Sequence, residues 1–202
     1  MKKARLEAFS DGVIAVIITI MVLELKVPQG ADWASLAPLA PVFLAYVLSF
    51  VFVGIYWNNH HHLLQVVEHV DGGILWANLH LLFWLSLIPF ANGWIADHFA
   101  TLPIALYGVI LLCAGIAYYI LERLLVRGHG RNSAMFKALG HDLKGQISVV
   151  VYAVAIPLAF VSAWLAFGLY AVVALMWLCP DPRVERTVAA WDAAERSKSA
   201  GE

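Results

Sequence analysis

Long apolar runs separated by short polar stretches make up most of this chain. Since about 20 apolar residues suffice for a helix to cross a bilayer, four of the runs predict one transmembrane helix each. These runs cover residues 7–27, 37–59, 72–94 and 101–122. The last run, residues 147–178, would form about 48 Å of helix, which exceeds a hydrocarbon core of about 30 Å. It therefore predicts two short helices, over 145–162 and 165–179, with a tight turn near residues 162–166. The pattern as a whole predicts an all-α membrane protein with six transmembrane helices.

Composition and charge agree with this interpretation. Hydrophobic residues make up 62% of the 202 residues and charged residues 13%, whereas a soluble domain is about half apolar and a quarter charged. With six spans and a cytoplasmic N-terminus, every lysine and arginine except Lys26 falls in a cytoplasmic segment. The positive-inside rule therefore predicts that both termini are cytoplasmic. Residues 1–180 then form the transmembrane domain, and residues 181–202 form a short cytosolic tail.

The first span carries more polar residues than a lipid-facing helix usually tolerates, and polar groups at membrane depth indicate a site of function or assembly. On a helical wheel of about 100° per residue, Ser10 and Asp11 point away from a largely apolar stripe. The stripe contains Arg5, Phe9, Gly12, Val16, Thr19, Ile20, Leu23 and Val27.

Two interpretations of this stripe stay open at this point. In the first, the aliphatic residues face lipid or a neighbouring helix, while Thr19 bonds back to a carbonyl one turn earlier. In the second, the stripe lines a narrow pore in which Val16, Ile20 and Leu23 form constrictions that gate by dewetting. Thr19 would then offer hydroxyl oxygens to a partly dehydrated cation.

Polar side chains of the second and third spans fall at the depth of Asp11, one to two turns inside the cytosolic boundary. A buried carboxylate needs partners, and asparagine, histidine and indole groups can donate hydrogen bonds to it. We therefore expect a network within one subunit that anchors the first helix. Its expected members besides Ser10 and Asp11 are Trp57, Asn58, His61, Asn78 and His80. The alternative is a proton relay through Asp11 and the histidines.

Nothing in the sequence indicates catalysis or a metal site. The three histidines at 60–62 are successive helical residues about 100° apart, so they cannot all face one ion. Cys113 and Cys179 stand alone in apolar runs, and HExxH, GxSxG and paired intramembrane aspartates do not occur. We expect no metal, no cofactor and no enzymatic activity. We also expect no nucleic-acid partner, because the basic residues are confined to short segments that already satisfy the topology.

The pattern RxxxFSDG…T…LE, followed by WNNHH and NLHLLFWLSLIPF, resembles the prokaryotic branch of the transmembrane-protein-175 family. The resemblance covers about residues 4–180, and its motif residues are Arg5, Phe9, Ser10, Asp11, Thr19, Leu23 and Glu24. It implies a leak-type channel in the prokaryotic plasma membrane that favours potassium over sodium. Potassium ions would be the permeant species, and no TVGYG filter is present.

The resemblance also implies roles for residues of the first helix, which lines the pore in this family. Val16 matches the main constriction, Ile20 and Leu23 match further aliphatic rings, and Thr19 matches the layer implicated in selectivity. Valine is smaller than the isoleucine or leucine of many members, which predicts a softer constriction. One copy of the motif per chain fits a homotetramer, because one helix per chain can enclose a pore only through cyclic symmetry.

Three questions remain open in the sequence. Arg5 lies on the pore stripe but could bend back to the anchoring network. Glu24 could add negative potential near the outer mouth, or could pair with a neighbour such as Lys26. The alternative function is a proton- or ion-coupled secondary transporter that uses Asp11 and the histidines. Such folds usually show internal repeats and broken helices. The chain has no evident repeat, although two prolines, Pro89 and Pro157, could interrupt helices.

Overall fold

The computed structural model describes residues 3–65, 67, 70–129 and 143–178, and within these ranges the regular structure is entirely helical. This confirms the all-α class. The N-terminal half holds α1 (Lys3–Met21), the 3₁₀ helices η1 (Val22–Glu24) and η2 (Trp33–Leu39), α2 (Ala40–Gln65), α3 (Gly72–Ser86) and α4 (Ile88–Asp97). The remaining helices are α5 (Thr101–His129), α7 (Leu143–Leu158) and α8 (Ala163–Leu178).

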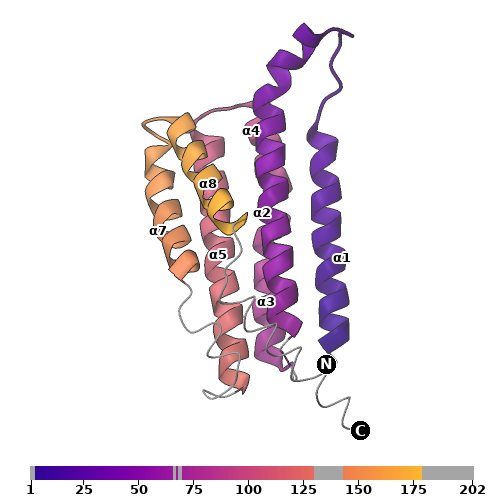
Figure 1. Cartoon of the computed structure of the whole chain (residues 1–202), viewed down its shortest axis with the longest axis vertical. Coiled ribbons are helices and arrows are strands. Elements are labelled where there is room, and N and C mark those ends of the chain that lie inside the picture. The colour runs from indigo at the N-terminus through magenta and orange to yellow at the C-terminus, as the bar shows by residue number, and fades with distance from the viewer. Residues whose placement is uncertain (1–2, 66, 68–69, 130–142, 179–202) are drawn as a thin grey trace.

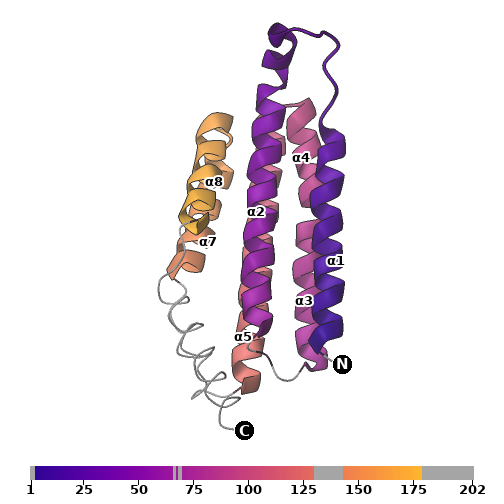
Figure 2. The ribbon, with the colours of Figure 1, turned by 45° about the vertical axis from the view of Figure 1, so that its right-hand side comes forward.

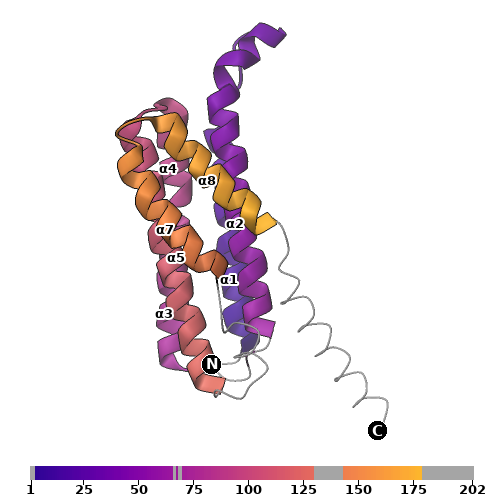
Figure 3. The ribbon, with the colours of Figure 1, turned by 60° about the vertical axis from the view of Figure 1, so that its left-hand side comes forward.

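The helices run up and down in one elongated bundle, with α1 at one edge and α7 near the opposite edge (Figure 1). α2 lies toward the viewer, while α3 and α4 follow one another behind it. The turned view separates α1, α3 and α4 from the pair α7 and α8 (Figure 2). α8 crosses the bundle obliquely and packs against α2, α5 and α7 (Figure 3). The helix at the edge, α1, is therefore covered by α2, α3 and α4 on one side only.

Four helical stretches in the described part of the chain are long and apolar enough to cross a membrane. They are Lys3–Glu24, Trp33–Gln65, Gly72–Asp97 and Thr101–Arg127. α7 and α8 are shorter apolar helices of 16 residues each. At 1.5 Å per residue each spans about 24 Å, somewhat less than a hydrocarbon core of about 30 Å. The apolar helices identify a membrane protein, and the count of six spans stays a prediction.

Helix ends differ from the expected spans where local chemistry decides them. α1 tightens into η1 after Met21, so Val27, expected at the end of the first span, lies outside the helix. α2 continues to Gln65, six residues beyond the expected end at 59, because polar residues extend a helix outside the apolar zone. α3 begins at Gly72 because the Asp71 carboxylate accepts a hydrogen bond from the Ile74 amide at 2.8 Å.

The third span is broken, which the sequence indicated only through Pro89. α3 ends at Ser86 and α4 begins at Ile88, with Leu87 between them. Proline has no amide hydrogen and its ring collides with the carbonyl one turn earlier, which kinks or breaks a helix, and the chain breaks just before Pro89. Pro157 lies inside α7, which ends one residue later. The following connection covers residues 159–162, slightly before the expected turn, and the tail from 181 onward lies outside the described residues.

Three buried hydrogen bonds join α2, α4, α5 and α8. The Ser49 hydroxyl of α2 lies 3.1 Å from both Asn92 Oδ1 of α4 and the Tyr107 hydroxyl of α5. The Tyr170 hydroxyl of α8 donates to the Ile104 carbonyl of α5 at 3.2 Å. The Tyr170 hydroxyl lies against Gly108, where a Cβ would overlap it. Glycine at this position therefore allows α8 to pack closely against α5.

Candidate pore helix and its anchor

α1 presents two faces of different chemistry. Its buried side chains recur every three or four residues, which matches the helical period. They are Leu6, Ser10, Ile14, Ile17 and Met21, and they pack toward α2, α3 and α4. The opposite face has no partner within the described chain. It carries the stripe expected from the wheel, and Val16 and Leu23 there are 54% and 78% exposed.

Each residue expected on the pore face is exposed in the single chain. Thr19 and Ile20 follow Val16 on this face of α1, and Leu23 lies in η1. The 3₁₀ turn changes the angle per residue from about 100° to about 120°, so Leu23 departs slightly from a straight α-helical stripe. Arg5 and Phe9 are exposed near the N-terminal end of the same helix, and neither joins the anchoring contacts described below. Arg5 therefore lies on the side of the pore stripe.

Thr19 makes the backbone contact that the first interpretation predicts. Its hydroxyl donates to the Val16 carbonyl at 2.9 Å. This bond uses the only proton of the hydroxyl, and both interpretations remain compatible with it. The oxygen still holds acceptor lone pairs, and the side chain is exposed. Thr19 therefore presents an oriented acceptor on the exposed face, which is what a cation would contact.

A buried chain of hydrogen bonds joins α1 to α3 and α2. The Ser10 hydroxyl donates to the Leu6 carbonyl at 2.9 Å and accepts from Asn78 Nδ2 at 2.9 Å. Asn78 Oδ1 lies 2.7 Å from His60 Nε2, and Ser10, Asn78 and His60 are all at most 1% exposed. Since Oδ1 can only accept, His60 Nε2 carries the proton. Ser10 thus anchors the helix from the inside.

The network predicted from the sequence did not include His60, which belongs to this buried chain. A wheel drawn for the second span would have identified His60. It lies on the same side as Ser49 and Val53, at offsets of eleven and seven residues, and all three are buried.

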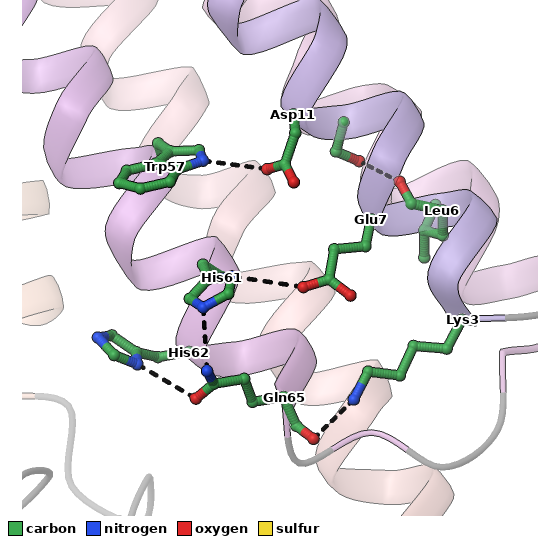
Figure 4. A network of polar contacts seen from close by, with 9 residues as sticks. Lys3, Leu6, Glu7, Asp11, Trp57, His61, His62 and Gln65 are labelled. Carbon is green, nitrogen blue, oxygen red and sulfur yellow. Dashed lines mark hydrogen bonds and ion pairs between the residues drawn. The ribbon is translucent and has the colours of Figure 1, made fainter.

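Asp11 and Trp57, two residues of the expected network, do meet. Trp57 Nε1 donates to Asp11 Oδ1 at 3.0 Å across the gap between α1 and α2 (Figure 4). Asp11 is half-buried and points away from the apolar stripe. An indole can donate but not accept a proton, so this contact orients the carboxylate and does not pass a proton onward.

The N-terminal end of α1 is held by a second group of contacts, shown in Figure 4. His61 Nδ1 lies 3.3 Å from Glu7 Oε1, and Gln65 Nε2 lies 2.9 Å from His61 Nε2. Lys3 Nζ donates to the Gln65 carbonyl at 2.7 Å. Because the amide nitrogen of Gln65 is a donor, His61 Nε2 accepts, and the neutral ring has its proton on Nδ1 toward Glu7. In this tautomer His61 accepts a hydrogen bond from Gln65 and directs its Nδ1–H toward Glu7.

The structure does not bring Asn58 and His80 into the network, against expectation. Asn58 is exposed, since one residue turns α2 by about 100° away from Trp57. His80 is also exposed, two residues and about 200° beyond the buried Asn78. Its Nε2 accepts from Trp84 Nε1 at 2.9 Å on the same helix.

The segment that follows α1 contacts α4. Lys26 forms an ion pair with Asp97, which raises the pKa of the lysine, and it does not pair with Glu24. The Glu24 carboxylate packs over Gly93 of α4, where a Cβ would come within 2.7 Å of Oε2. Polar contacts therefore hold the N-terminal part of α1 and the segment that follows η1, while residues 12–21 contact the other helices through apolar packing.

No other part of the described chain offers a comparable polar site. Among these residues, no group of three His, Cys, Asp or Glu side chains could hold a metal ion. A largely apolar cavity of about 400 Å³ lies between α2, α5 and α7, where Ile55, Tyr56 and Val149 contribute to its wall. It is on the side of α2 that faces away from α1, so it is not part of the pore helix or its anchor.

Comparison with known proteins decides the family. The model of the family TMEM175, described as an endosomal/lysosomal potassium channel, matches residues 5–89. A protein of Chryseobacterium sp. (strain P1-3) that is named a potassium channel is 57% identical over 189 residues, covering 93% of this chain and 98% of that protein. The chain belongs to the TMEM175 family. This confirms the resemblance seen in the motif residues.

A solved TMEM175 structure has the same fold. The crystal structure of a lysosomal potassium-selective channel TMEM175 homologue from Chamaesiphon minutus matches with a TM-score of 0.76 and 31% identity, over 87% of this chain and 96% of that one. Human TMEM175, named an endosomal/lysosomal proton channel, is 34% identical over 103 residues, or 20% of its length. TMEM175 proteins are ion channels, which are not an enzyme class.

Proposed function

We propose that four copies of this chain form a potassium-selective, leak-type channel in the prokaryotic plasma membrane, with α1 of each copy lining a central pore. The observation that carries the proposal is the division of α1 into two faces. Every polar side chain of α1 that makes a contact with another helix lies off the stripe, whereas the stripe itself is exposed and combines aliphatic residues with one threonine. Four such stripes around an axis would enclose a narrow, mostly apolar pore.

Val16, Ile20 and Leu23 supply the constriction in this proposal. On a helix, Val16 and Ile20 are about 6 Å apart along the axis, and Leu23 is about 4.5 Å further. Successive apolar rings at this spacing exclude water from a narrow pore, and an ion must then lose part of its hydration shell to pass. The rings would therefore control conductance.

Thr19 supplies the selectivity layer. Its hydroxyl proton is directed to the Val16 carbonyl, so the oxygen would face a passing ion as an acceptor. Potassium gives up water more readily than sodium because it is larger and more weakly hydrated. One hydroxyl ring offers fewer ligands than a stack of carbonyl rings, so moderate selectivity is expected.

The contacts favour a channel over a carrier with a proton relay. Asp11 is bonded to an indole, and His61 is satisfied in its neutral form by Glu7 and Gln65. Among the described residues, no hydrogen bond links Asp11 to a histidine. The names of vertebrate relatives include proton channels, so proton permeation belongs in the measurement.

The decisive experiment is electrical recording from the purified protein in planar bilayers under opposed potassium and sodium gradients, repeated under a proton gradient. We expect single-channel steps and a reversal potential displaced toward the potassium equilibrium potential. Saturable, coupled flux without single-channel steps would instead favour the transporter.

A further inference from the structure

Two polar side chains at membrane depth have no role inside the subunit. Asn58 of α2 is exposed, and His80 of α3 is exposed with only Trp84 of its own helix as partner in the described structure. Polar side chains of transmembrane helices face protein or water rather than lipid, since lipid offers them no hydrogen bonds. Something other than lipid should therefore cover these two positions.

Asn58 and His80 lie on opposite faces of the molecule, one on each side of α1. His60 of α2 and Asn78 of α3 point toward each other, which defines the inside of both helices. Around the axis of α2, Asn58 lies about 160° from His60, and around the axis of α3, His80 lies about 200° from Asn78. Each of the two side chains therefore points almost directly outward. Figure 1 shows α2 in front of α3.

The two side chains have complementary hydrogen-bonding groups. His80 Nε2 accepts from the Trp84 indole at 2.9 Å, so the neutral ring carries its proton on Nδ1. That N–H has no acceptor in the described part of the chain. The Asn58 carboxamide offers an acceptor oxygen and has none of its groups engaged there. A bond from His80 Nδ1 to Asn58 Oδ1 would satisfy both.

The two faces also match in the depth of their polar residues and in the size of the residues beside them. Asn58 lies about 10.5 Å above the cytosolic end of α2, and His80 lies about 12 Å above the cytosolic start of α3. One turn farther from the cytosol, α2 has Gly54, where no neighbouring atom stands within 4 Å of a Cβ position. At the same level α3 carries Phe83, which is 55% exposed. A bulky ring on one face thus matches an open position on the other.

We propose that these faces form the boundary between neighbouring copies of this chain, with His80 of one copy hydrogen-bonded to Asn58 of the next and Phe83 packed at Gly54. The inference rests on the proposed homotetramer. Rotation about an axis beside α1 brings the front face of one copy against the rear face of another. A ring of this kind needs two different, complementary patches, and the outward faces of α2 and α3 at Asn58 and His80 form such a pair.

Cross-linking tests the contact. In a chain with Cys113 and Cys179 replaced by alanine, N58C and H80C are combined and treated in membranes with a short bis-methanethiosulfonate reagent. A flexible reagent is preferable to direct oxidation, since a disulfide needs Cβ atoms about 4 Å apart. We expect cross-linked dimers, trimers and tetramers from the double variant, and monomers from either single variant, because neither position meets its own copy.

The matched control pairs N58C with V154C. Val154 is exposed on α7, at the edge far from α1, and should give monomers. Native mass spectrometry of each variant separates the two hypotheses. Tetramers that cross-link in N58C alone, in the Val154 pair, or not at all would overturn this interface and leave the channel proposal intact. Monomers throughout would overturn both.

A double-mutant cycle tests the hydrogen bond itself. We expect N58A and H80A each to weaken every contact between neighbouring copies by about 3- to 20-fold, the range for one hydrogen bond between membrane helices, as measured from tetramer dissociation. The double variant should be no worse than either single one. S86A, which alters an exposed α3 hydroxyl bonded to its own helix, should have no effect. Additive effects of N58A and H80A, or none, would rule out the pairing.

Discussion

At the scale of single residues, α1 separates its tasks by side-chain direction. Ser10 and Asp11 are adjacent in sequence but make their contacts with different helices, Ser10 with Asn78 of α3 and Asp11 with Trp57 of α2. Neither Val16 nor Thr19 has a side-chain hydrogen bond to another helix in the described structure. Val16 is aliphatic, whereas Thr19 carries a hydroxyl group. Each pore-facing residue can therefore be replaced without removing an anchoring contact.

Shortening Val16 tests the constriction. V16A removes two methyl groups from each copy of the exposed ring and should raise single-channel conductance, with little effect on folding because the side chain is 54% exposed. V13A is the matched control, since Val13 lies on the same helix and packs against the core. Its conductance should stay near that of the unmodified protein. Equal conductance in V16A and the unmodified protein would show that Val16 is not a constriction.

Thr19 gives a test of selectivity. T19A removes the hydroxyl oxygen and should lower the potassium-to-sodium permeability ratio measured from reversal potentials. T19S keeps the oxygen and should retain most of the ratio. A ratio that is unchanged in T19A, or reduced equally in both variants, would mean that the hydroxyl does not contact the ion.

At the scale of elements, the main point is how α1 is attached to α2 and α3. The chain Ser10–Asn78–His60 links three helices through two side-chain hydrogen bonds in a buried site. A buried polar group that loses its partner costs about 1–3 kcal/mol. The position of α1, the proposed pore helix, therefore depends on a few buried residues that lie off its exposed stripe.

Asn78→Leu should weaken the protein through this chain. The leucine removes the partners of Ser10 and His60 together, and we expect a loss of about 2–4 kcal/mol in the free energy of unfolding, from one or two unsatisfied groups. Urea unfolding in detergent, followed by tryptophan fluorescence, measures it. The control A77L places leucine beside it at a buried position of similar depth. A loss in A77L as large as in N78L would point to crowding rather than lost hydrogen bonds.

Sequence reasoning found the elements more reliably than their details. Apolar runs identified the helical regions because burial in lipid requires hydrophobicity, and the wheel found the exposed face of α1. The ends of α1 and α2 were not predicted, because a helix can tighten into a 3₁₀ turn or continue beyond the apolar zone. His60 was missed because the wheel was drawn for one span only, and a partner on another helix is invisible until both are placed.

At the scale of the whole molecule, the chain is an elongated bundle with α1 along one edge (Figure 2). A bundle of this shape has its two broad faces available for neighbours and its far edge, with α7, available for lipid. The size of the assembly is therefore a direct test of the arrangement. Four copies of the 22.2 kDa chain give about 89 kDa.

Native mass spectrometry of the purified protein, released from detergent, should show this tetramer as the main species. The Ser10–Asn78 chain lies within one subunit, so N78L should lower the melting temperature more than it lowers the tetramer fraction among folded molecules. A folded, monomeric protein would remove the pore, because one α1 cannot enclose it. A stable dimer would mean that the exposed stripe of α1 does not enclose the pore through fourfold symmetry.

The attachment of α1 at its two ends has a consequence for how such a protein can diverge. Residues 3–11 and Lys26 carry the polar contacts, whereas residues 12–21 are held by apolar packing and present the exposed stripe between them. Changes of size or branching at the exposed positions of that segment leave these attachments and the buried packing untouched. Under the proposed function, natural variation there would adjust ion flow in small steps while each subunit keeps its fold.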